Sequence, residues 1–598
     1  MSTFADLFKY LKIYRRYLGR RMYLIFVLAI ATALTQGFGI TLLLPLLRAS
    51  QSGGSPEDMG TVEQMLQSVL GWMGIADSMV GILVFIAIVF LGKGGLQFAR
   101  GAYQGYLQAQ LLRELKTQLF DAYSGMDYQY YVKQNAGHFI NVINQQVDRF
   151  FDSFNSFVGF LTKGFSVLCY FAFAFAITWR FAGLVLGVGI IILFLFKYLN
   201  AYVRGLSRRY SEEMSHLNKL LVQSLQSFKY IVSTNQVSHL RSGIVNSVND
   251  LTGYIYRQRI AKAFTGACKE PISVLLIVSI IVIQVSIFEE SATPIFVALL
   301  LFHRGMQGVL GMQGTWQGTM NKIGSLEMVN DEMVSVLGNQ EDRKGESIGP
   351  LSEGVDFQGV YYSYNSEEYT LRDININIPA NETIALVGES GAGKSTLVDL
   401  LTLMLKPSRG TILIDRIPHE EIAIKSWRSQ IGYVSQETVV FDDTVANNIS
   451  LWRGDIEEDP ALREEIYDAA RRAHADHFIR DLPNGYQTLV GDQGIRLSGG
   501  QRQRLFIARE LFKQPNLLLL DEATSDLDTA SEQHIQNSID ALKGEVTVVI
   551  IAHRLSTIKN ADQIYVIEEG SVSEKGSYQD LRSYEDGVFR SMVKMQSL

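Results

Sequence analysis

The sequence predicts a helical membrane domain followed by an α/β domain, and two observations support this division. The chain has 598 residues, which is more than one hydrophobic core can organise, so at least two domains are expected. Nearly all of its long uncharged runs lie before about residue 330, whereas the later part alternates apolar and charged residues. We therefore expect a membrane domain over residues 1–336, a linker over 337–354 and a soluble α/β domain over 355–598.

The first apolar run, Met22–Leu47, is long enough to cross a membrane as a helix. It is too long for the apolar core of a signal peptide and does not end in a small-residue cleavage site. The segment before it, Met1–Arg21, contains six basic residues and one acid, which the positive-inside rule places in the cytoplasm. Five further runs of this kind follow, namely Ser78–Leu96, Phe154–Thr178, Phe181–Phe196, Phe264–Phe288 and Pro294–Val309.

Six spans place both chain termini in the cytoplasm. The expected outer loop Ala49–Asp77 contains acidic residues but no Lys or Arg, in agreement with this topology. Arg48 and Arg180 lie on the outer side and oppose it. We expect an integral, multi-pass protein of a bacterial inner (plasma) membrane.

Two long polar segments, Gln97–Asp152 and Ala201–Lys262, separate spans two from three and four from five. Both have helical periodicity and little Gly or Pro, so the membrane helices are expected to continue into the cytoplasm. Each segment would turn back at a tip, about Asp127–Gly137 and about Thr234–Arg241. The tips could be merely solvated, but the alternation of long and short loops favours docking on the soluble domain.

The soluble part contains the phosphate-loop pattern G-x-x-x-x-G-K-[ST] at Gly388–Ser395. An apolar run typical of a buried strand, Thr383–Val387, precedes it, and the apolar face of a helix, Leu397–Leu401, follows. Glycines allow backbone N–H groups to surround phosphate oxygens, and the helix N-terminus adds partial positive charge. The motif therefore predicts a nucleoside triphosphate and Mg²⁺, bound through Gly388, Ser390, Gly391, Gly393, Lys394, Ser395 and Thr396.

Net charge and cysteine content exclude other classes of protein. The net charge is −7 and no basic stripe is present, which argues against nucleic acid as a partner. The only two cysteines, Cys169 and Cys268, both lie inside apolar runs. They can build neither a disulfide framework nor a metal cluster.

Six further signals follow the linker in a fixed order. Each has the composition of a strand end, a helix start or a loop, and alone each is weak. They are Tyr364 in the aromatic strand Val360–Tyr364, Gln436 after the strand Ile431–Ser435, Leu497–Gln501 at the start of a helix, Asp521 and Glu522 ending an apolar strand, the loop Ser525–Asp528, and His553 after the strand Val546–Ala552.

Together these motifs resemble the ATP-binding cassette (ABC) ATPases, and with six spans ahead of them the chain resembles a half-transporter of the type IV exporter class. The resemblance implies an α-helical six-span transmembrane domain fused to an α/β P-loop ABC ATPase domain that couples ATP hydrolysis to transport. It implies that Asp521, Ser395 and Gln436 hold Mg²⁺ and that Glu522 is the general base. It further implies that Tyr364 stacks on adenine and that His553 contacts the γ-phosphate.

In this family the signature, here Ser498, Gly499, Gly500 and Gln501, closes over ATP bound to the opposite cassette. The chain has one cassette, whose phosphate loop, Glu522, signature and His553 are all intact, so two identical copies would form two competent sites. A homodimer is therefore expected, and pairing with a different half-transporter stays open. The second position of the loop Ser525–Asp528 is Asp526, where the family commonly has alanine.

Charged residues within the spans are candidates for substrate binding, because a charge at the bilayer centre costs roughly 3 kcal/mol or more. They are Lys93, Lys163, Lys269, Glu270 and Arg304. The cations could extend to lipid headgroups at the membrane surface, or several could face one cavity and bind an anionic headgroup.

The first span, with Gly37–Leu47, and the basic position late in span six resemble flippases of lipid-linked oligosaccharides and exporters of glycolipids. This resemblance implies an amphiphilic, anionic lipid-type substrate moved from the inner to the outer leaflet. Export of peptides or hydrophobic small molecules is the alternative, as is an ATP-gated channel or a regulatory membrane ATPase. The identity of the substrate and the resting conformation stay open.

Overall fold

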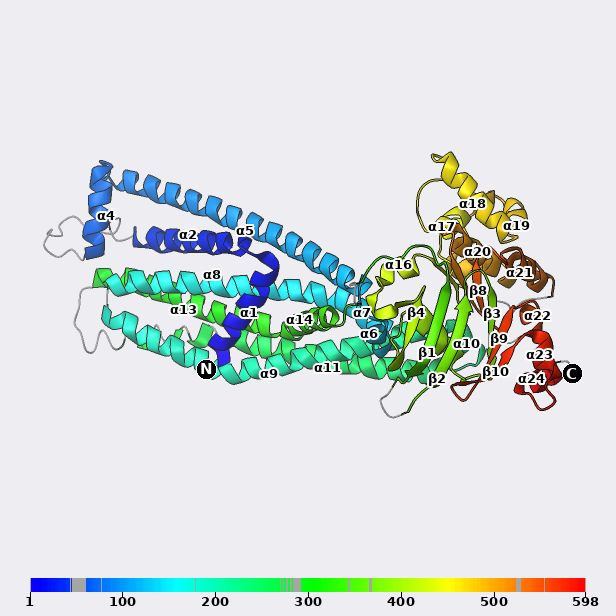
Figure 1. The fold of residues 1–598 in the computed structure, drawn as a ribbon. Coiled ribbons are helices and arrows are strands. Elements are labelled where there is room, and N and C mark those ends of the chain that lie inside the picture. The colour runs from blue at the N-terminus through cyan, green and yellow to red at the C-terminus, as the bar shows by residue number, and fades with distance from the viewer. Residues whose placement is uncertain are drawn as a thin grey trace. The chain divides into compact units, whose positions relative to one another are not determined.

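The computed structural model describes residues 2–42, 45, 61–76, 78–177, 179–268, 270–272, 274–275, 278–279, 282, 292–341, 345–364, 368–522, 529–552 and 554–596. The chain forms two compact units (Figure 1). The first comprises Met1–Met126 and Tyr130–Gln340, and the second comprises Asp127–Gln129 and Glu341–Leu598.

The regular elements described in the first unit are all helices, of which α6 begins with two residues of the second unit (Figure 1). Its elements are α1 (Ser2–Leu18), α2 (Arg21–Thr41), α4 (Thr61–Trp72), α5 (Met79–Ser124), α6 (Tyr128–Lys133), α7 (Ala136–Asn141), a π-helical turn (Val142–Gln146), α8 (Val147–Ile177), α9 (Trp179–Gln226), α10 (Phe228–Ser233), α11 (Val237–Ala267), α13 (Ala292–Met320) and α14 (Ile323–Gly338). Five of the six expected spans lie mainly within α2, α5, α8, α9 and α13. The span Phe264–Phe288 begins in α11, and about half of its residues lie outside the described ones.

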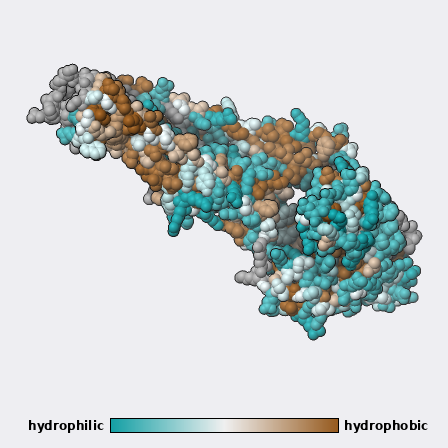
Figure 2. All heavy atoms as spheres, turned by 90° about the horizontal axis from the view of Figure 1, so that it is seen from above, coloured by the Kyte–Doolittle hydropathy of each residue, from teal (hydrophilic) through white to brown (hydrophobic). Residues whose placement is uncertain are grey.

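Helix α5 shows how one element serves two environments. Its first half is mainly apolar, and apolar side chains such as Val80, Leu91 and Phe98 are exposed within the unit, which suits contact with lipid. Its second half buries residues at i, i+4 spacing, from Leu107 to Leu119. Within the described residues, two continuous helical segments, Met79–Ser124 and Ala136–Ala176, are long and apolar enough to cross a membrane. Figure 2 shows hydrophobic side chains over much of the visible face of this unit.

Aromatic packing fixes the N-terminal helix α1, which the sequence analysis treated only as a basic segment. Tyr14 is fully buried and its hydroxyl donates to Ser153 Oγ on α8 over 3.0 Å. Its ring packs against Phe150, Phe154 and Phe157 of the same helix, with ring centroids 5.2–5.5 Å apart. Helix α1 is therefore amphipathic: in addition to its basic residues it has an apolar face, which packs into the core of the unit.

Two boundaries differ from the sequence-based expectation. The second tip was expected at about Thr234–Arg241, but α9 already ends at Gln226 and the short helix α10 forms the turn, so Val237–Arg241 belong to α11. The linker was expected from Leu337, but α14 continues to Gly338 because Met333 and Val336 are buried in the helical core.

The second unit is an α/β structure with two sheets (Figure 1). Its strands are β1 (Gly354–Tyr362), β2 (Leu371–Pro379), β3 (Thr383–Gly388), β4 (Arg409–Ile414), β5 (Ile417–Pro418), β6 (Ile431–Val434), β7 (Leu517–Asp521), β8 (Thr547–Ile551), β9 (Gln563–Glu568) and β10 (Ser571–Gly576). Its α-helices are α15 (Lys394–Leu401), α16 (Ile424–Arg428), α17 (Val445–Ser450), α18 (Pro460–Arg472), α19 (Asp476–Arg480), α20 (Gly499–Phe512), α21 (Thr529–Ala541), α22 (Leu555–Ile558), α23 (Tyr578–Ser583) and α24 (Val588–Gln596).

The larger sheet has the strand order β10-β9-β3-β8-β7-β6, and its strands are parallel except for β10. Successive residues of its central strands enter two different cores, one on each face. Along β3, Ile384 and Leu386 join one core whereas Ala385 and Val387 join the other. This double burial explains why the central strands are continuous apolar runs, and it places the carboxyl ends of β3, β6, β7 and β8 at one edge.

Candidate nucleotide site

The phosphate loop connects β3 to α15, as the sequence predicts. Gly393 adopts φ +102°, a backbone conformation that residues with a side chain rarely adopt, and a Cβ built there would lie 2.5 Å from Leu371 Cδ2. No side chain caps the described N-terminus of α15, which leaves its first N–H groups available to an anion. The loop thus forms a cradle whose chemistry fits a phosphate chain.

Lys394 lies inside this cradle with 5% of its surface exposed. Its Nζ donates to the carbonyl oxygens of Gly388 and Glu389, each over 2.8 Å. Burial lowers the pKa of Lys394, and the nearby carboxylates of Glu522 and Asp521 act in the opposite direction. The ammonium is therefore held beside the acids that end β7.

Tyr364 lies beyond the end of β1, whereas the sequence analysis placed it within a strand. The strand ends at Tyr362, and the shifts in register along β1 show that pairing becomes irregular towards this end. The hydroxyl of Tyr364 is 3.3 Å from Thr396 Oγ1 on α15, and its ring is 57% exposed. An exposed ring beside the phosphate loop can stack on a nucleobase.

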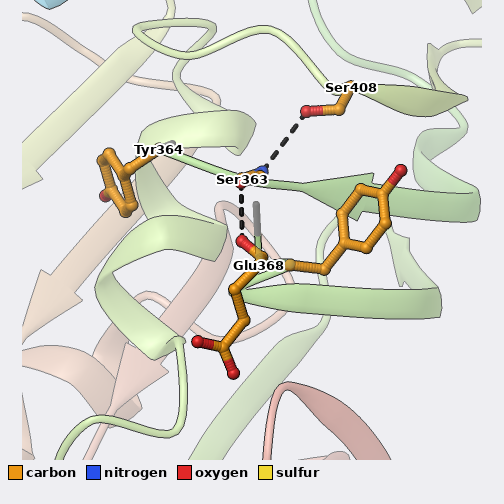
Figure 3. Close-up of a pocket in the computed structure, with 5 residues that line it drawn as sticks. Ser363, Tyr364, Glu368 and Ser408 are labelled. Atoms are coloured by element: carbon orange, nitrogen blue, oxygen red, sulfur yellow. Dashed lines mark hydrogen bonds between the residues drawn. The ribbon is translucent and has the colours of Figure 1, made fainter. Parts of the chain in front are cut away.

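A pocket of about 250 Å³ adjoins this tyrosine and is lined by Ser363, Tyr364, Glu368, Tyr369 and Ser408 (Figure 3). Ser363 shapes it: its N–H donates to Ser408 Oγ over 3.3 Å and its hydroxyl donates to the carbonyl oxygen of Glu368 over 2.6 Å. These bonds hold Ser363 against Ser408 and Glu368 beside the exposed ring.

The two acids and the glutamine meet at the carboxyl edge of the large sheet. β6 and β7 are adjacent parallel strands, so the residues that follow them emerge side by side. Gln436 Nε2 donates to Glu522 Oε2 over 2.8 Å, and the hydroxyl of Tyr433 donates to Asp521 Oδ2 over 3.3 Å. The carboxylate and amide oxygens, with the hydroxyl of Ser395 on the phosphate loop, are the ligand types that Mg²⁺ prefers.

Glu522 adopts φ +51°, in the left-handed region where non-glycine residues are uncommon. Its N–H donates to the carbonyl oxygen of Ile551 on β8 over 3.0 Å, which holds the backbone there. Residues in sparsely populated conformations cost about 1–3 kcal/mol and gather at active sites. The left-handed backbone at Glu522 turns this residue away from the line of β7, to which Asp521 still belongs.

Sequence reasoning missed two residues beside these acids. Tyr433 was read only as part of a strand, and Asp399 only as part of a helix. Burial, with the charge of Asp521, raises the pKa of Asp399 to about 6. Burial, with the same charge, also raises the pKa of Tyr433. The sequence offered the same signal for both residues. Tyr433 in β6 and Asp399 in α15 each carry a polar group within an otherwise apolar, buried run.

The signature residues start helix α20 as expected. Ser498 is the N-cap: its hydroxyl accepts from Gln501 N over 3.3 Å, and Ser498 N donates to Gln501 Oε1 over 2.9 Å. This reciprocal pair satisfies two groups at the helix start and keeps Gly499 and Gly500 in the first turn. The N-terminus of α20 is thereby presented at the surface of the unit. His553 and the loop Ser525–Asp528 lie outside the described residues.

The charged residues of the membrane spans have different surroundings. Lys163 Nζ donates to the carbonyl oxygen of Gly311 over 3.0 Å, where α8 packs closely on α13. Lys93 Nζ lies 5.0 Å from the ring centroid of Phe90, and it is near enough to the exposed Arg304 for their charges to repel. Lys269 lies outside the described residues.

Comparison with known proteins identifies both units. The family model described as ABC transporter transmembrane region matches residues 22–310, and the model described as ABC transporter matches residues 371–525. The ATP-dependent lipid A-core flippase of Escherichia coli (strain K12) is 30% identical to this chain over 95% of this chain and 94% of its own length.

Two further similarities cover nearly the whole chain. The heterocyst differentiation ATP-binding protein HepA of Nostoc sp. is 29% identical over 91% of this chain and 89% of its own length. The solved structure of a bacterial Atm1-family ABC exporter with ATP bound has a TM-score of 0.80 and 24% identity, covering 97% of this chain and 99% of the exporter. This last likeness shows a shared fold.

Proposed function

This chain belongs to the ABC transporter family, and we propose that it hydrolyses ATP to move an anionic, lipid-type amphiphile from the inner to the outer leaflet of a bacterial inner membrane. It is an integral, multi-pass exporter half with an ATP-binding domain. The finer elements of the proposal are the substrate class, the roles of individual residues, the homodimer, and the position of both termini in the cytoplasm.

The hydrolytic part of the proposal rests on the bond between Gln436 and Glu522. Glu522 would accept a proton from the attacking water, and Gln436 would keep its carboxylate in place. Ser395, Asp521 and Gln436 would hold Mg²⁺, which supplies charge neutralisation on the phosphates. Lys394 would contact the β- and γ-phosphates, Tyr364 would stack on the base, and His553 would contact the γ-phosphate.

A second copy of the chain would complete each site. The surface N-terminus of α20, with Ser498 and Gly500, would face the triphosphate on the partner cassette. Because one chain contains one phosphate loop and one signature, two identical chains would form two equivalent sites. Domain limits of 1–336, 337–354 and 355–598, adjusted for the longer α14, suit this arrangement.

The tips of the cytoplasmic hairpins would couple the two parts. The short helix α10 exposes three apolar side chains, Phe228, Tyr230 and Val232, which are 63%, 69% and 50% exposed. The α/β unit exposes Leu489 and Ile495 on either side of Val490–Gln493, at 52% and 80%. Exposed apolar side chains on both parts support docking, because removing apolar surface from water is favourable.

The similarity to ATP-dependent lipid A-core flippases supports a lipid-type substrate, and Lys93 and Arg304, whose charges interact, support an anionic one. Two like charges near each other in a membrane domain repel, and an anion between them would relieve this repulsion. Lys163 has a different role in this proposal, because its ammonium already binds the carbonyl oxygen of Gly311.

ATPase activity in proteoliposomes tests the proposal. An anionic glycolipid should stimulate hydrolysis, whereas a zwitterionic lipid of equal chain length should not. Lys93→Met and Arg304→Met should each weaken the stimulation about tenfold, as expected for losing a charge-assisted bond of roughly 1.5–3 kcal/mol. Lys197→Met is the matched control, since Lys197 lies 6.0 Å from the Phe194 ring in the same i−3 arrangement as Lys93 and Phe90. Equal stimulation by both lipids would contradict the anionic substrate.

A further inference from the structure

Helix α16 places two consecutive side chains on the end of the phosphate-loop helix α15. Trp427 is fully buried, and its Nε1 donates to the carbonyl oxygen of Leu401 over 2.8 Å. Arg428 Nε donates to the carbonyl oxygen of Thr402 over 2.9 Å, and its Nη2 donates to that of Leu403 over 2.8 Å. The last carbonyls of a helix have no partners within it, so these bonds cap the C-terminus of α15 from another segment of the chain.

The cap bears on the nucleotide site because α15 is short. The helix has 8 residues, Lys394–Leu401. A rise of about 1.5 Å per residue makes it about 12 Å long, with the phosphate loop at one end and the cap at the other. Close-packed interiors transmit displacement, so a shift of the capped end would move Lys394 and the N–H groups of the loop. The positive charge of Arg428 also suits the C-terminus of a helix.

Arg428 has a third bond, which leads to the linker. Its Nη1 lies 2.7 Å from Glu341 Oε1, and both side chains are 29% exposed. A guanidinium can bond to a carboxylate and to two carbonyl oxygens at once, because its N–H donors point in fixed directions within one plane. One side chain therefore joins the linker to the end of α15.

The first bonded residues of the linker belong to different units. Gln340 Nε2 donates to the carbonyl oxygens of Ala122 and Val336 over 3.0 and 2.8 Å, and all three residues belong to the helical unit. Glu341 is the next residue, and it belongs to the α/β unit together with Arg428. A displacement of the end of α14 therefore reaches Glu341 through Gln340 and one peptide bond.

Further bonds fasten the later part of the linker to α16 and its N-terminal flank. Glu346 N donates to the carbonyl oxygen of Glu421 over 2.8 Å, and Ala423 N donates to that of Glu346 over 2.9 Å. Ile348 N donates to Ser426 Oγ over 3.2 Å. Helix α16 is therefore bonded both to the linker and to the C-terminus of α15.

We propose that Arg428 is a positioning residue for the phosphate loop, and that its bond to Glu341 lets the position of the linker set the affinity for ATP. Arg428 would act through α15 rather than by contact with the nucleotide. This inference rests on the proposed function, because it takes the phosphate loop as the ATP site. It adds a route within one chain, from the end of α14 to that loop, which is separate from docking of the cytoplasmic tips.

The test compares two glutamates of the linker that each pair with an arginine. Glu341→Gln removes the charge that holds Arg428. Glu353→Gln is the matched control, because Glu353 pairs with Arg416 and so fastens the linker to the turn between β4 and β5. Arg428→Lys keeps the charge of the cap but loses the planar fork.

Full-length variants in lipid nanodiscs are measured for the Kd of a fluorescent ATP analogue, KM for ATP, kcat, thermal midpoint and hydrogen exchange of a peptide covering residues 388–403. Arg428→Lys should raise Kd and KM about tenfold, as expected for the loss of a charge-assisted bond, with kcat at saturating ATP within about twofold. Exchange in the peptide should accelerate, because the end of α15 loses part of its cap.

Glu341→Gln should raise Kd and KM about threefold, as expected for the weakening of one hydrogen bond, and should also accelerate exchange in the peptide. Glu353→Gln should leave the Kd and this exchange unchanged. Glu341→Gln keeps the bonds between Arg428 and α15, so it decides the matter if Arg428→Lys does not fold.

A wild-type Kd in Glu341→Gln, or an equal rise in Glu353→Gln, would overturn the inference. A lower thermal midpoint with an unchanged Kd in Arg428→Lys would also overturn it, because the cap would then serve stability alone. Binding of the analogue does not depend on lipid transport, so the two proposals fail separately. A wild-type protein whose hydrolysis does not respond to anionic glycolipid would refute the proposed substrate, while the expected rise in Kd for Glu341→Gln would still support the link.

Discussion

The side-chain amide of Gln436 donates to the carboxylate of Glu522 over 2.8 Å, across 86 positions of sequence. Adjacent parallel strands bring the two residues together, and the left-handed backbone of Glu522 directs its side chain at the strand end. A carboxylate held by an amide is oriented, and general base catalysis requires an oriented base.

Replacing Glu522 by Gln should abolish steady-state ATP hydrolysis while ATP binding is kept. The amide has the same shape but cannot accept a proton, and general base catalysis typically contributes about 10²–10⁴-fold. Phosphate release and binding of a fluorescent ATP analogue are measured on the same preparation. Hydrolysis within about threefold of wild type would remove Glu522 from the role of base.

Docking of the cytoplasmic tips should be detectable by cysteine crosslinking. Cysteines at Tyr230 on α10 and at Asp492 are introduced after Cys169 and Cys268 have been replaced by Ala. The apolar side chains of α10 are exposed to solvent and would be buried by docking. We therefore expect a crosslinked product, either within one chain or between two copies. Absence of any product in every nucleotide state would refute docking at this position.

Asp415 should stabilise the α/β unit in a pH-dependent way. Burial raises its pKa, but bonds from the N–H groups of Gly354, Glu353 and Ser352 outweigh burial and hold the pKa below its usual value. The carboxylate therefore contributes stability above about pH 4, and this contribution is lost as the pH falls through the lowered pKa. Asp415→Asn should lower the thermal midpoint at pH 7 but have little effect below the folded-state pKa. An equal change at both pH values would contradict this explanation.

Removing the bond between Tyr433 and Asp521 should alter the affinity for Mg²⁺ more than the affinity for ATP. Tyr433→Phe deletes only the hydroxyl, and outer groups that orient a metal ligand typically change metal affinity about 10–100-fold. The Mg²⁺ dependence of ATPase activity is compared with ATP binding in the presence of a chelator. Tyr467→Phe is the control, because Tyr467 packs on Tyr486 in the α18–α19 region. No shift in the Mg²⁺ midpoint would exclude an orienting role for the hydroxyl.

Local patterns predicted the α/β elements closely. The apolar runs at Thr383 and Leu517 became β3 and β7 because burial on both faces of a parallel sheet leaves little freedom in composition. The glycines of the phosphate loop were readable because their backbone geometry excludes a side chain. Both signals are local, and the sequence contains them in full.

Relationships between distant segments were not readable. No local pattern shows that Lys163 binds the carbonyl oxygen of Gly311, because the partner is a backbone atom on a helix 148 positions away. The same applies to Arg509 and Asn448, whose bonds depend on how α20 packs on α17. The end of β1 before Tyr364 was missed because its aromatic residues favour a strand, whereas irregular pairing ends the ladder at Tyr362.

The most direct test of this account is ATP-driven movement of a fluorescent anionic glycolipid between the leaflets of proteoliposomes, measured by its protection from a membrane-impermeant quencher. We predict transfer with Mg-ATP for the wild-type protein, no transfer for Glu522→Gln, and no transfer of a zwitterionic probe. Transfer that persists in Glu522→Gln, or that is equal for the zwitterionic probe, would contradict an ATP-driven transporter of anionic lipids.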